Sequence, residues 1–240
     1  MKNVLTILLF FLACVAYSQK PDSTIYELRI YKAAEGKRDQ LTNMIQNSAE
    51  KMFEKHGMGV IGFWTDADSS RVIFIIAHKN KMGMENSWKD FYSDPAWPSL
   101  KANLSNEGPV TVSIKSIPME GADILPKMET INPSTPHRDE LRIYTCYPDR
   151  LPNLINRFRA KTNSLFAKHQ MYGIAYWKTI EVNGKQPQLI YILRHKDKEG
   201  QVANWKEFRA DPEWIAFKDE TEKDGKIVDK VDVVNMMPVK

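Results

Sequence analysis

Two short segments of the chain combine an acidic, a basic and a phenolic residue at alternate positions. They are Glu27, Arg29 and Tyr31 in the first segment and Glu140, Arg142 and Tyr144 in the second. A guanidinium can hold an anionic or carbonyl group, and a carboxylate or phenol can transfer a proton. Charged residues are rarely fully buried unless they are paired. We therefore expect a polar pocket in which the arginines and tyrosines bind a ligand and the two glutamates are catalytic.

The same six residues also permit a purely structural interpretation. Glutamate and arginine on neighbouring strands can form an ion-pair network that holds two sheets in register. Buried ion pairs of this kind occur without any catalytic role. Both interpretations remain open at the level of sequence.

Two histidines follow equivalent helix-like segments in the two halves of the chain. They are His56 and His169, and each is a candidate for proton transfer or haem ligation. The structural alternative is that a charged histidine near a helix C-terminus is favoured by the helix dipole. His78 and His195 stand beside a lysine at the end of another predicted strand. We expect these two to contact solvent and to have no specific role.

The six tryptophans are the second informative set. Trp64 and Trp177 lie on predicted strands, and we expect them to line the pocket, where an aromatic wall suits an apolar or ring-shaped ligand. The other four flank an Asp-Pro pair in each half, and we expect them in an aromatic core.

Several kinds of site have no motif in this chain. HxH, HExxH and CxxC spacings are absent, so we expect no metal site. A glycine-rich phosphate loop and a Gly-x-Ser-x-Gly motif are absent as well. We expect no cofactor, with haem as the alternative. The net charge is +4 without a basic block, so we expect no nucleic-acid partner.

The N-terminus resembles a secretory signal. Lys2 precedes an apolar run over residues 4–12, and small residues lie at two positions of 16–18. This pattern predicts a signal peptide over residues 1–18, cleavage before Gln19, and a periplasmic or secreted protein. A lipoprotein with Cys14 as the modified residue is the alternative. The apolar run is too short for a spanning helix, and no other segment could cross a membrane.

The chain repeats itself. Glu-Leu-Arg-Ile-Tyr begins at Glu27 and again at Glu140, which is 140 − 27 = 113 positions later. Beyond Trp64 and Trp177 the offset becomes 117, as between Trp88 and Trp205 (205 − 88 = 117), because the second copy holds four more residues in a hairpin. Such self-similarity indicates duplication. It predicts a first unit over residues 21–120, a linker over 121–137 and a second unit over 138–240.

One unit has the order β-α-β-β-α-β. The predicted elements are strand 24–31, helix 36–56, strand 59–65, strand 71–78, helix 84–92 with a restart at Asp94-Pro95, and strand 110–117. This order is ferredoxin-like and leaves one face of the sheet without helices. We therefore predict an α+β fold of two tandem ferredoxin-like units that pack sheet to sheet as a barrel within one chain.

The sequence resembles the NIPSNAP family. The resemblance rests on the opening Tyr-Glu-Leu-Arg-Ile-Tyr, the Lys-His-Gly after the first helix, the Gly-Phe-Trp strand, and Trp-Lys-Asp-Phe with its following Asp-Pro-x-Trp. The second copy departs from it, with Gln170 in place of Gly57 and Tyr176 in place of Phe63. The resemblance implies the dimeric α+β barrel fold, which cofactor-free monooxygenases, lactone isomerases and haem-degrading enzymes also use.

These features predict an exported protein with a polar and aromatic pocket between its two sheets. That pocket would bind or transform a small organic molecule without an organic cofactor. If it is catalytic, the resemblance implies a cofactor-independent monooxygenase-like or isomerase-like enzyme. The alternative is a non-catalytic structural or interaction module with a filled barrel. The sequence leaves open whether the chain forms a homo-oligomer.

Overall fold

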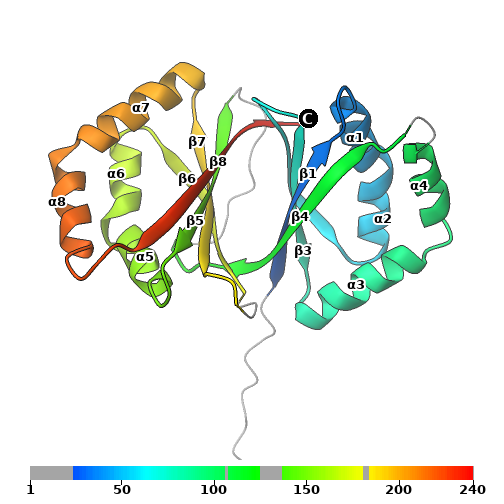
Figure 1. Cartoon of the computed structure of the whole chain (residues 1–240), viewed down its shortest axis with the longest axis horizontal. Helices are drawn as coiled ribbons and strands as arrows, with labels where there is room; N and C mark the ends of the chain where they lie inside the picture. The colour runs from blue at the N-terminus through cyan, green and yellow to red at the C-terminus, as the bar shows by residue number, and fades with distance from the viewer. Residues whose placement is uncertain (1–23, 106–107, 125–136, 181–183, 240) are drawn as a thin grey trace, which may run out of the picture.

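The computed structural model describes residues 24–105, 108–124, 137–180 and 184–239 (Figure 1). The predicted signal peptide, its cleavage before Gln19 and the alternative lipidation at Cys14 lie outside these residues. Most of the predicted linker lies outside them too.

Each half of the chain forms the predicted β-α-β-β-α-β unit. The elements of the first unit are β1 (Ile25–Ala33), α1 (Arg38–Met44), η1 (Ile45–Ala49), α2 (Glu50–Lys55), β2 (Gly59–Asp66), β3 (Arg71–His78), α3 (Lys81–Ser93), α4 (Trp97–Ser105) and β4 (Thr111–Gly121). Those of the second are β5 (Arg138–Cys146), α5 (Leu151–Arg157), η2 (Phe158–Thr162), α6 (Asn163–Lys168), β6 (Tyr172–Thr179), β7 (Gln188–His195), α7 (Lys198–Ala210), α8 (Pro212–Thr221) and β8 (Val228–Pro238). The tandem α+β fold is confirmed.

Side-chain caps fix where the later helices begin. Asn80 accepts a hydrogen bond from the backbone N–H of Gly83 at 2.7 Å, and Asp197 accepts one from the N–H of Gly200 at 2.7 Å at the start of α7. Asp211 accepts from the N–H of Glu213 at 2.9 Å, so the predicted Asp-Pro helix start is present in the second unit. These carboxylate and amide oxygens satisfy N–H groups that the helix itself leaves unpaired.

The first helix of each unit differs from the sequence prediction. We expected a continuous helix over 36–56, but a π-helical turn interrupts it at η1, and η2 does the same in the second unit. Apolar residues spaced four apart fit an α-turn and a π-turn equally well, so the pattern could not distinguish them. Gly57 ends the first of these helices with a φ of +72°. Gln170 takes the equivalent place with a φ of +54°, a conformation that costs a residue with a Cβ atom about 1 kcal/mol.

The two sheets close into one antiparallel barrel. The strand order around it is β1-β3-β2-β8-β5-β7-β6-β4. Strand β2 pairs with β8, and β4 pairs with β6, so both seams join one unit to the other. Figure 1 shows the helices of the two units on the opposite outer flanks of this barrel. The predicted sheet-to-sheet packing is therefore confirmed.

The barrel interior is an apolar core to which all eight strands contribute. Its buried members are Leu28, Ile30, Trp64, Ile73, Ile75, Ile117, Met119, Leu141, Ile143, Ala175, Trp177, Ile190, Ile192, Val234 and Met236. Neighbouring residues of a strand point to opposite faces. Leu28 and Ile30 face the interior, so the residues that alternate with them face the helices. The expectation that Glu27, Arg29 and Tyr31 face the interior was wrong, and it was equally wrong for Glu140, Arg142 and Tyr144.

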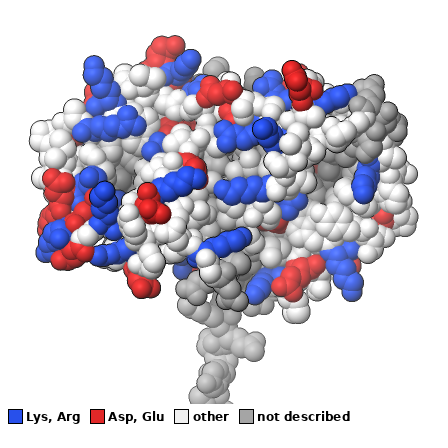
Figure 2. Space-filling view, in the orientation of Figure 1, with Lys and Arg blue, Asp and Glu red and all other residues white. Residues whose placement is uncertain are grey.

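Charged side chains lie intermixed on the molecular surface. Figure 2 shows lysines and arginines next to aspartates and glutamates over both units on the face in view, without a large patch of one sign there. This distribution agrees with the alternation of charge along the sequence.

Truncation of a barrel residue tests whether the two units share one core. Leu28 and Leu141 hold duplicate positions and are both 0% exposed. We expect Leu28→Ala and Leu141→Ala each to lower the free energy of unfolding by about 2–5 kcal/mol. Urea unfolding should show one cooperative transition in both variants, while Val112→Ala, at an exposed position, should change little. Two transitions, of which only one shifts, would contradict a shared core.

Candidate functional site

The polar residues of β1 form a buried cluster under α3. Glu27 Oε2 accepts a hydrogen bond from the indole of Trp88 at 2.6 Å and lies 3.2 Å from His78 Nε2. Glu27 Oε1 accepts hydrogen bonds from Arg29 at 2.7 Å and from Ser116. The carboxylate is thus held by four side chains from β1, β3, β4 and α3.

The second unit repeats this cluster with one substitution among the donors. Glu140 Oε2 accepts from the indole of Trp205 at 2.7 Å and from the amide of Gln201 at 2.7 Å, and lies 3.0 Å from His195 Nε2. Glu140 Oε1 accepts from Arg142. Gln201 therefore supplies the fourth donor in the second unit, on Oε2, whereas Ser116 donates to Oε1 in the first.

These contacts keep both carboxylates ionised. Burial raises the pKa of Glu27, but the hydrogen bond with His78 and the charge of Arg29 outweigh it and lower the pKa to about 2. The pKa of Glu140 is lowered to about 2 as well, because His195 and Arg142 outweigh its burial. Such a carboxylate is a weak base at neutral pH. The geometry favours it as an anchor for the arginine rather than as a proton acceptor.

From the sequence we expected His78 and His195 to contact solvent. The structure shows that both are buried. Their exposed fractions are 1% and 0%. The lysine that follows each of them indicated a strand end at the surface, but the partner glutamate lies beneath the helix. Each histidine is therefore part of the buried cluster.

Each buried arginine connects its glutamate to a tyrosine. Arg29 Nη2 donates to the hydroxyl of Tyr31 at 2.8 Å, and Arg142 Nε donates to that of Tyr144 at 3.3 Å. The guanidinium of Arg142 also lies 4.2 Å from the ring centre of Trp205, a cation–π contact that fixes its plane. The structure thus brings the predicted glutamate, arginine and tyrosine of each unit together, but on the helix side of the sheet.

The other predicted site residues lie elsewhere. His56 Nε2 is 2.8 Å from Asp94, and His169 Nε2 is 2.8 Å from Asp211. Asp211 caps the start of α8, and Asp94 precedes α4. Lys55 binds the carboxylate of Asp94, and Lys168 binds that of Asp211. Each imidazole is thus tied through Nε2 to a carboxylate near the start of the last helix, and haem ligation stays a prediction. Their positions support the structural interpretation at the helix end.

Trp64 and Trp177 lie inside the barrel and not at a pocket wall. The indole of Trp64 donates to Asp139 at 3.0 Å, and Asp139 is also held by two hydrogen bonds from Arg194. Trp177 packs against Tyr26, with ring centres 5.9 Å apart. Both tryptophans therefore join one unit to the other, and the expectation that they line a pocket between the sheets was wrong.

The second unit contains a cavity between its sheet and its helices. Its volume is about 350 Å³, at the small end of the range of small-molecule sites. The lining residues come from β5, α5, η2, α6, α7, α8, β8 and the segment before β8. They are Tyr144, Arg157, Phe158, Thr162, Phe166, Phe208, Trp214, Lys218, Glu222, Lys226, Val228, Asp229 and Val231. Tyr144 is the only one of the ten predicted site residues among them.

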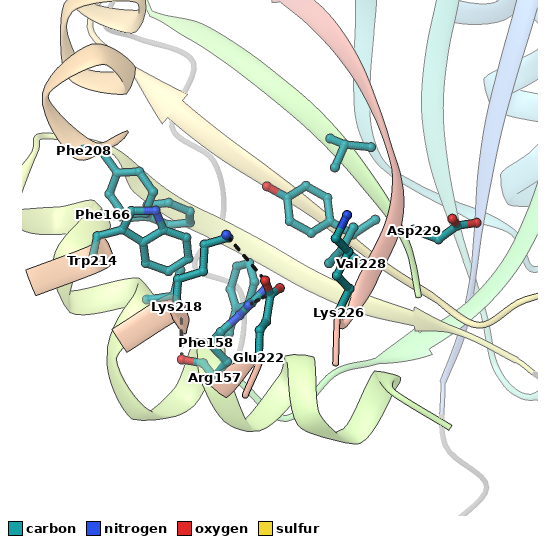
Figure 3. A pocket seen from close by; sticks show the side chains of 13 residues that line it. Arg157, Phe158, Phe166, Phe208, Trp214, Lys218, Glu222, Lys226, Val228 and Asp229 are labelled. Carbon is teal, nitrogen blue, oxygen red and sulfur yellow. Dashed lines mark hydrogen bonds and ion pairs between the residues drawn. The ribbon is translucent and has the colours of Figure 1, made fainter. Parts of the chain in front are cut away.

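The cavity has an aromatic side and a charged side. Figure 3 shows Phe166, Phe208 and Trp214 gathered at one end, and Lys226 and Asp229 towards β8. Between them the carboxylate of Glu222 binds Arg157 Nη1 at 2.9 Å and Lys218 at 3.4 Å. The arrangement can enclose a planar ring and hold a polar substituent.

Sequence reasoning missed this cavity, although the duplication contained a signal for it. Apolar positions of the first unit become polar in the second, where Arg157, Tyr176 and Tyr191 replace Met44, Phe63 and Phe74. Tyr191 is completely buried. Its hydroxyl interacts electrostatically with Tyr144, but it has no partner in hydrogen-bonding geometry among the described residues. Burial raises the pKa of Tyr191 well above its usual value. Of these three polar replacements, Arg157 lines the cavity.

Two further features concern the described part of the chain as a whole. Within it, no group of three or more His, Cys, Asp or Glu side chains could hold a metal ion. No helix in the same part is long and apolar enough to span a membrane.

The lowered pKa values of Glu27 and Glu140 predict acid sensitivity. The folded pKa of about 2 lies below the ordinary value of 4.5, so this stabilisation is complete above pH 4.5 and is lost as the pH falls towards 2. Each carboxylate should contribute about 3 kcal/mol at neutral pH. We expect Glu140→Gln to be less stable at pH 7 and to lose less stability on acidification, as measured by urea unfolding. Glu54→Gln, at an exposed position, is the control, and identical acid profiles for the wild type and Glu140→Gln would refute this account.

One family of known proteins resembles the chain in sequence. The sequence profile of the NIPSNAP family matches residues 26–119 and 139–240, one match in each unit. No curated protein is significantly similar to the chain in sequence.

Solved structures share the whole two-unit fold. A provisionally assigned monooxygenase from Fusobacterium nucleatum superposes with a TM-score of 0.60 at 9% identity, over 91% of this chain and 94% of its own. An anthrone oxidase-like protein superposes with a TM-score of 0.60 at 13% identity, over 91% of this chain and 92% of its own. A provisionally assigned monooxygenase from Lactobacillus acidophilus superposes with a TM-score of 0.56 at 12% identity, over 90% of this chain and 94% of its own. At these identities the likeness establishes the fold alone.

The two profile matches cover most of the chain and coincide with the two structural repeats. The chain therefore belongs to the NIPSNAP family.

Proposed function

We propose that this chain is an exported protein that binds a small aromatic molecule in the helix–sheet cavity of its second unit. The supporting observation is an aromatic-walled cavity that reaches Tyr144, the tyrosine of the predicted site. The proposal keeps the small-molecule function expected from the sequence and moves it out of the barrel. The proposal of export rests on the signal-like residues 1–18. Mass spectrometry of the chain recovered from the periplasm tests it, because a cleaved chain begins at Gln19.

Tyr144 is the group best placed to contact an oxygen of the ligand. Its hydroxyl accepts a hydrogen bond from Arg142, so its own proton is available for donation. Glu140 fixes Arg142, and the Trp205 ring fixes the guanidinium plane. Glu140 and Arg142 are therefore positioning residues in this proposal, and Tyr144 makes the contact.

Oxidation without an organic cofactor is the second candidate function. It is favoured by a tyrosine hydrogen-bonded to a cation, which can stabilise negative charge on a phenolic or enolic oxygen of a substrate. The fold is shared with an anthrone oxidase-like protein, which suggests anthrone as a probe by analogy. In that reaction C10 of anthrone loses two hydrogens and gains one oxygen atom of O2, and the other oxygen atom leaves as water.

The competing interpretation is a structural or interaction module. The apolar, filled barrel interior fits it, because no ligand is needed to complete that core. A measurement of binding in the cavity outside the barrel separates the two.

Filling the cavity should abolish binding. Val231 lines the cavity and is 42% exposed, so Val231→Trp can place an indole there without disturbing the barrel. We expect it to weaken the binding of 2-naphthol at least about tenfold in calorimetry, equal to about 1.4 kcal/mol. Ile114→Trp makes the same addition at the duplicate position of the first unit and should bind like the wild type. If the wild type binds no two- or three-ring probe, the binding proposal is rejected and the structural interpretation is favoured.

Turnover is tested with anthrone and a pair of tyrosine variants. We expect the wild type to accelerate O2 consumption over the spontaneous rate, and Tyr144→Phe to lower that acceleration at least about tenfold, because the contact to the substrate oxygen is lost. Tyr31→Phe removes the equivalent hydroxyl from the first unit and should leave the rate unchanged. No acceleration by the wild type, with 2-naphthol still bound, would retain binding and reject anthrone oxidation.

A further inference from the structure

We infer that the cavity of the second unit selects aromatic carboxylates, and that the ligand's carboxylate binds Arg157 in place of Glu222. This inference rests on the proposed binding function and specifies the class of ligand.

Arg157 is a built receptor for an anion. Its side chain is 4% exposed and lines the cavity. Nη1 binds Glu222 at 2.9 Å, but Nε is buried without a partner among the described residues. A guanidinium presents its donors in a planar fork that matches the two oxygens of a carboxylate. An unpaired buried N–H costs free energy, so a ligand that satisfies it gains affinity.

Glu222 occupies this receptor at the C-terminal end of a helix, where burial raises its pKa but the contact with Arg157 outweighs burial and lowers it. It is the residue that follows α8, where the carbonyl ends of the helix carry partial negative charge. A carboxylate at this end is held by Arg157 and Lys218 against that dipole. Its side chain is 16% exposed, so it can turn outwards to solvent. Glu222 thus resembles a tethered substitute for the ligand's own anionic group.

The charge balance of the lining favours an anion once Glu222 is displaced. Arg157, Lys218 and Lys226 are basic, and the remaining acidic residue is Asp229. Lys226 makes no ion pair among the described residues, and Asp229 is bound by Gln186 at 3.3 Å. A negative ligand would therefore meet an excess of positive charge in the cavity.

The aromatic wall places the rest of the ligand. Phe158, Phe166, Phe208 and Trp214 line the cavity, and the guanidinium of Arg157 lies 5.7 Å from the ring centre of Trp214. A planar ring against these side chains can reach Arg157 with its carboxylate. The equivalent of Arg157 in the first unit is Met44, so anion selection belongs to the second unit alone.

Two probes with the same ring test the inference in calorimetry at neutral pH. They are 2-naphthoate, which carries a carboxylate, and 2-naphthol, which is neutral. We expect Glu222→Gln to bind 2-naphthoate about tenfold tighter than the wild type, because the competing carboxylate is gone, and to bind 2-naphthol unchanged. Glu220→Gln makes the same charge change at an exposed position two residues away and should alter neither affinity.

Arg157→Met supplies the opposite arm, because it installs the residue of the first unit. We expect at least about a tenfold loss of 2-naphthoate affinity with 2-naphthol retained. If this variant does not fold, as judged by its melting temperature, the result of Glu222→Gln decides alone. Binding of 2-naphthol with no gain of 2-naphthoate in Glu222→Gln would overturn the inference and leave the proposed function standing. Absence of binding by both probes in the wild type would overturn both.

Discussion

The structure depends on the burial of two helix-free sheet faces against each other. A four-stranded sheet with helices on one side leaves its other side apolar and exposed, and the second copy in the same chain has the same need. Pairing of β2 with β8 and of β4 with β6 leaves no open edge between them. The interior created in this way is largely apolar, with Asp139 held there by Trp64 and Arg194, and Glu27 and Glu140 lie on the opposite face of their strands.

The two glutamate clusters lie in the helix–sheet layers. Glu27 and Glu140 lie between sheet and helix, where the indoles of Trp88 and Trp205 reach them from α3 and α7. Each cluster carries an arginine whose charge compensates the carboxylate, and each arginine holds a tyrosine. In the second unit the tyrosine borders a cavity, so a rigid, charge-balanced network supports a residue that can meet a ligand.

Much of the fold was predictable because it depends on patterns along the chain. The recurrence of Glu-Leu-Arg-Ile-Tyr located the two units, and the alternation and helical spacing gave the element order. The direction of β1 was not predictable, because both of its faces are buried and alternation alone does not tell the core from the helix side. The burial of His78 was missed for a related reason. Its partner Glu27 is 51 positions away, and only the register of β1 against β3 brings the two together.

The duplication also shows how the helix–sheet layer of the second unit differs from that of the first. Two copies that share one barrel experience the same packing demands, so the first unit shows what those demands alone require: Met44, Phe63 and Phe74 fill its helix–sheet layer with apolar atoms. At the same positions the second unit holds Arg157, Tyr176 and Tyr191, whose polar atoms are costly to bury. Gln170, with its left-handed backbone, adds a further local cost in the same unit. Among these residues Arg157 lines the cavity, so the cost of its burial falls where the proposed ligand would bind, and local departures from packing rules are expected at functional sites.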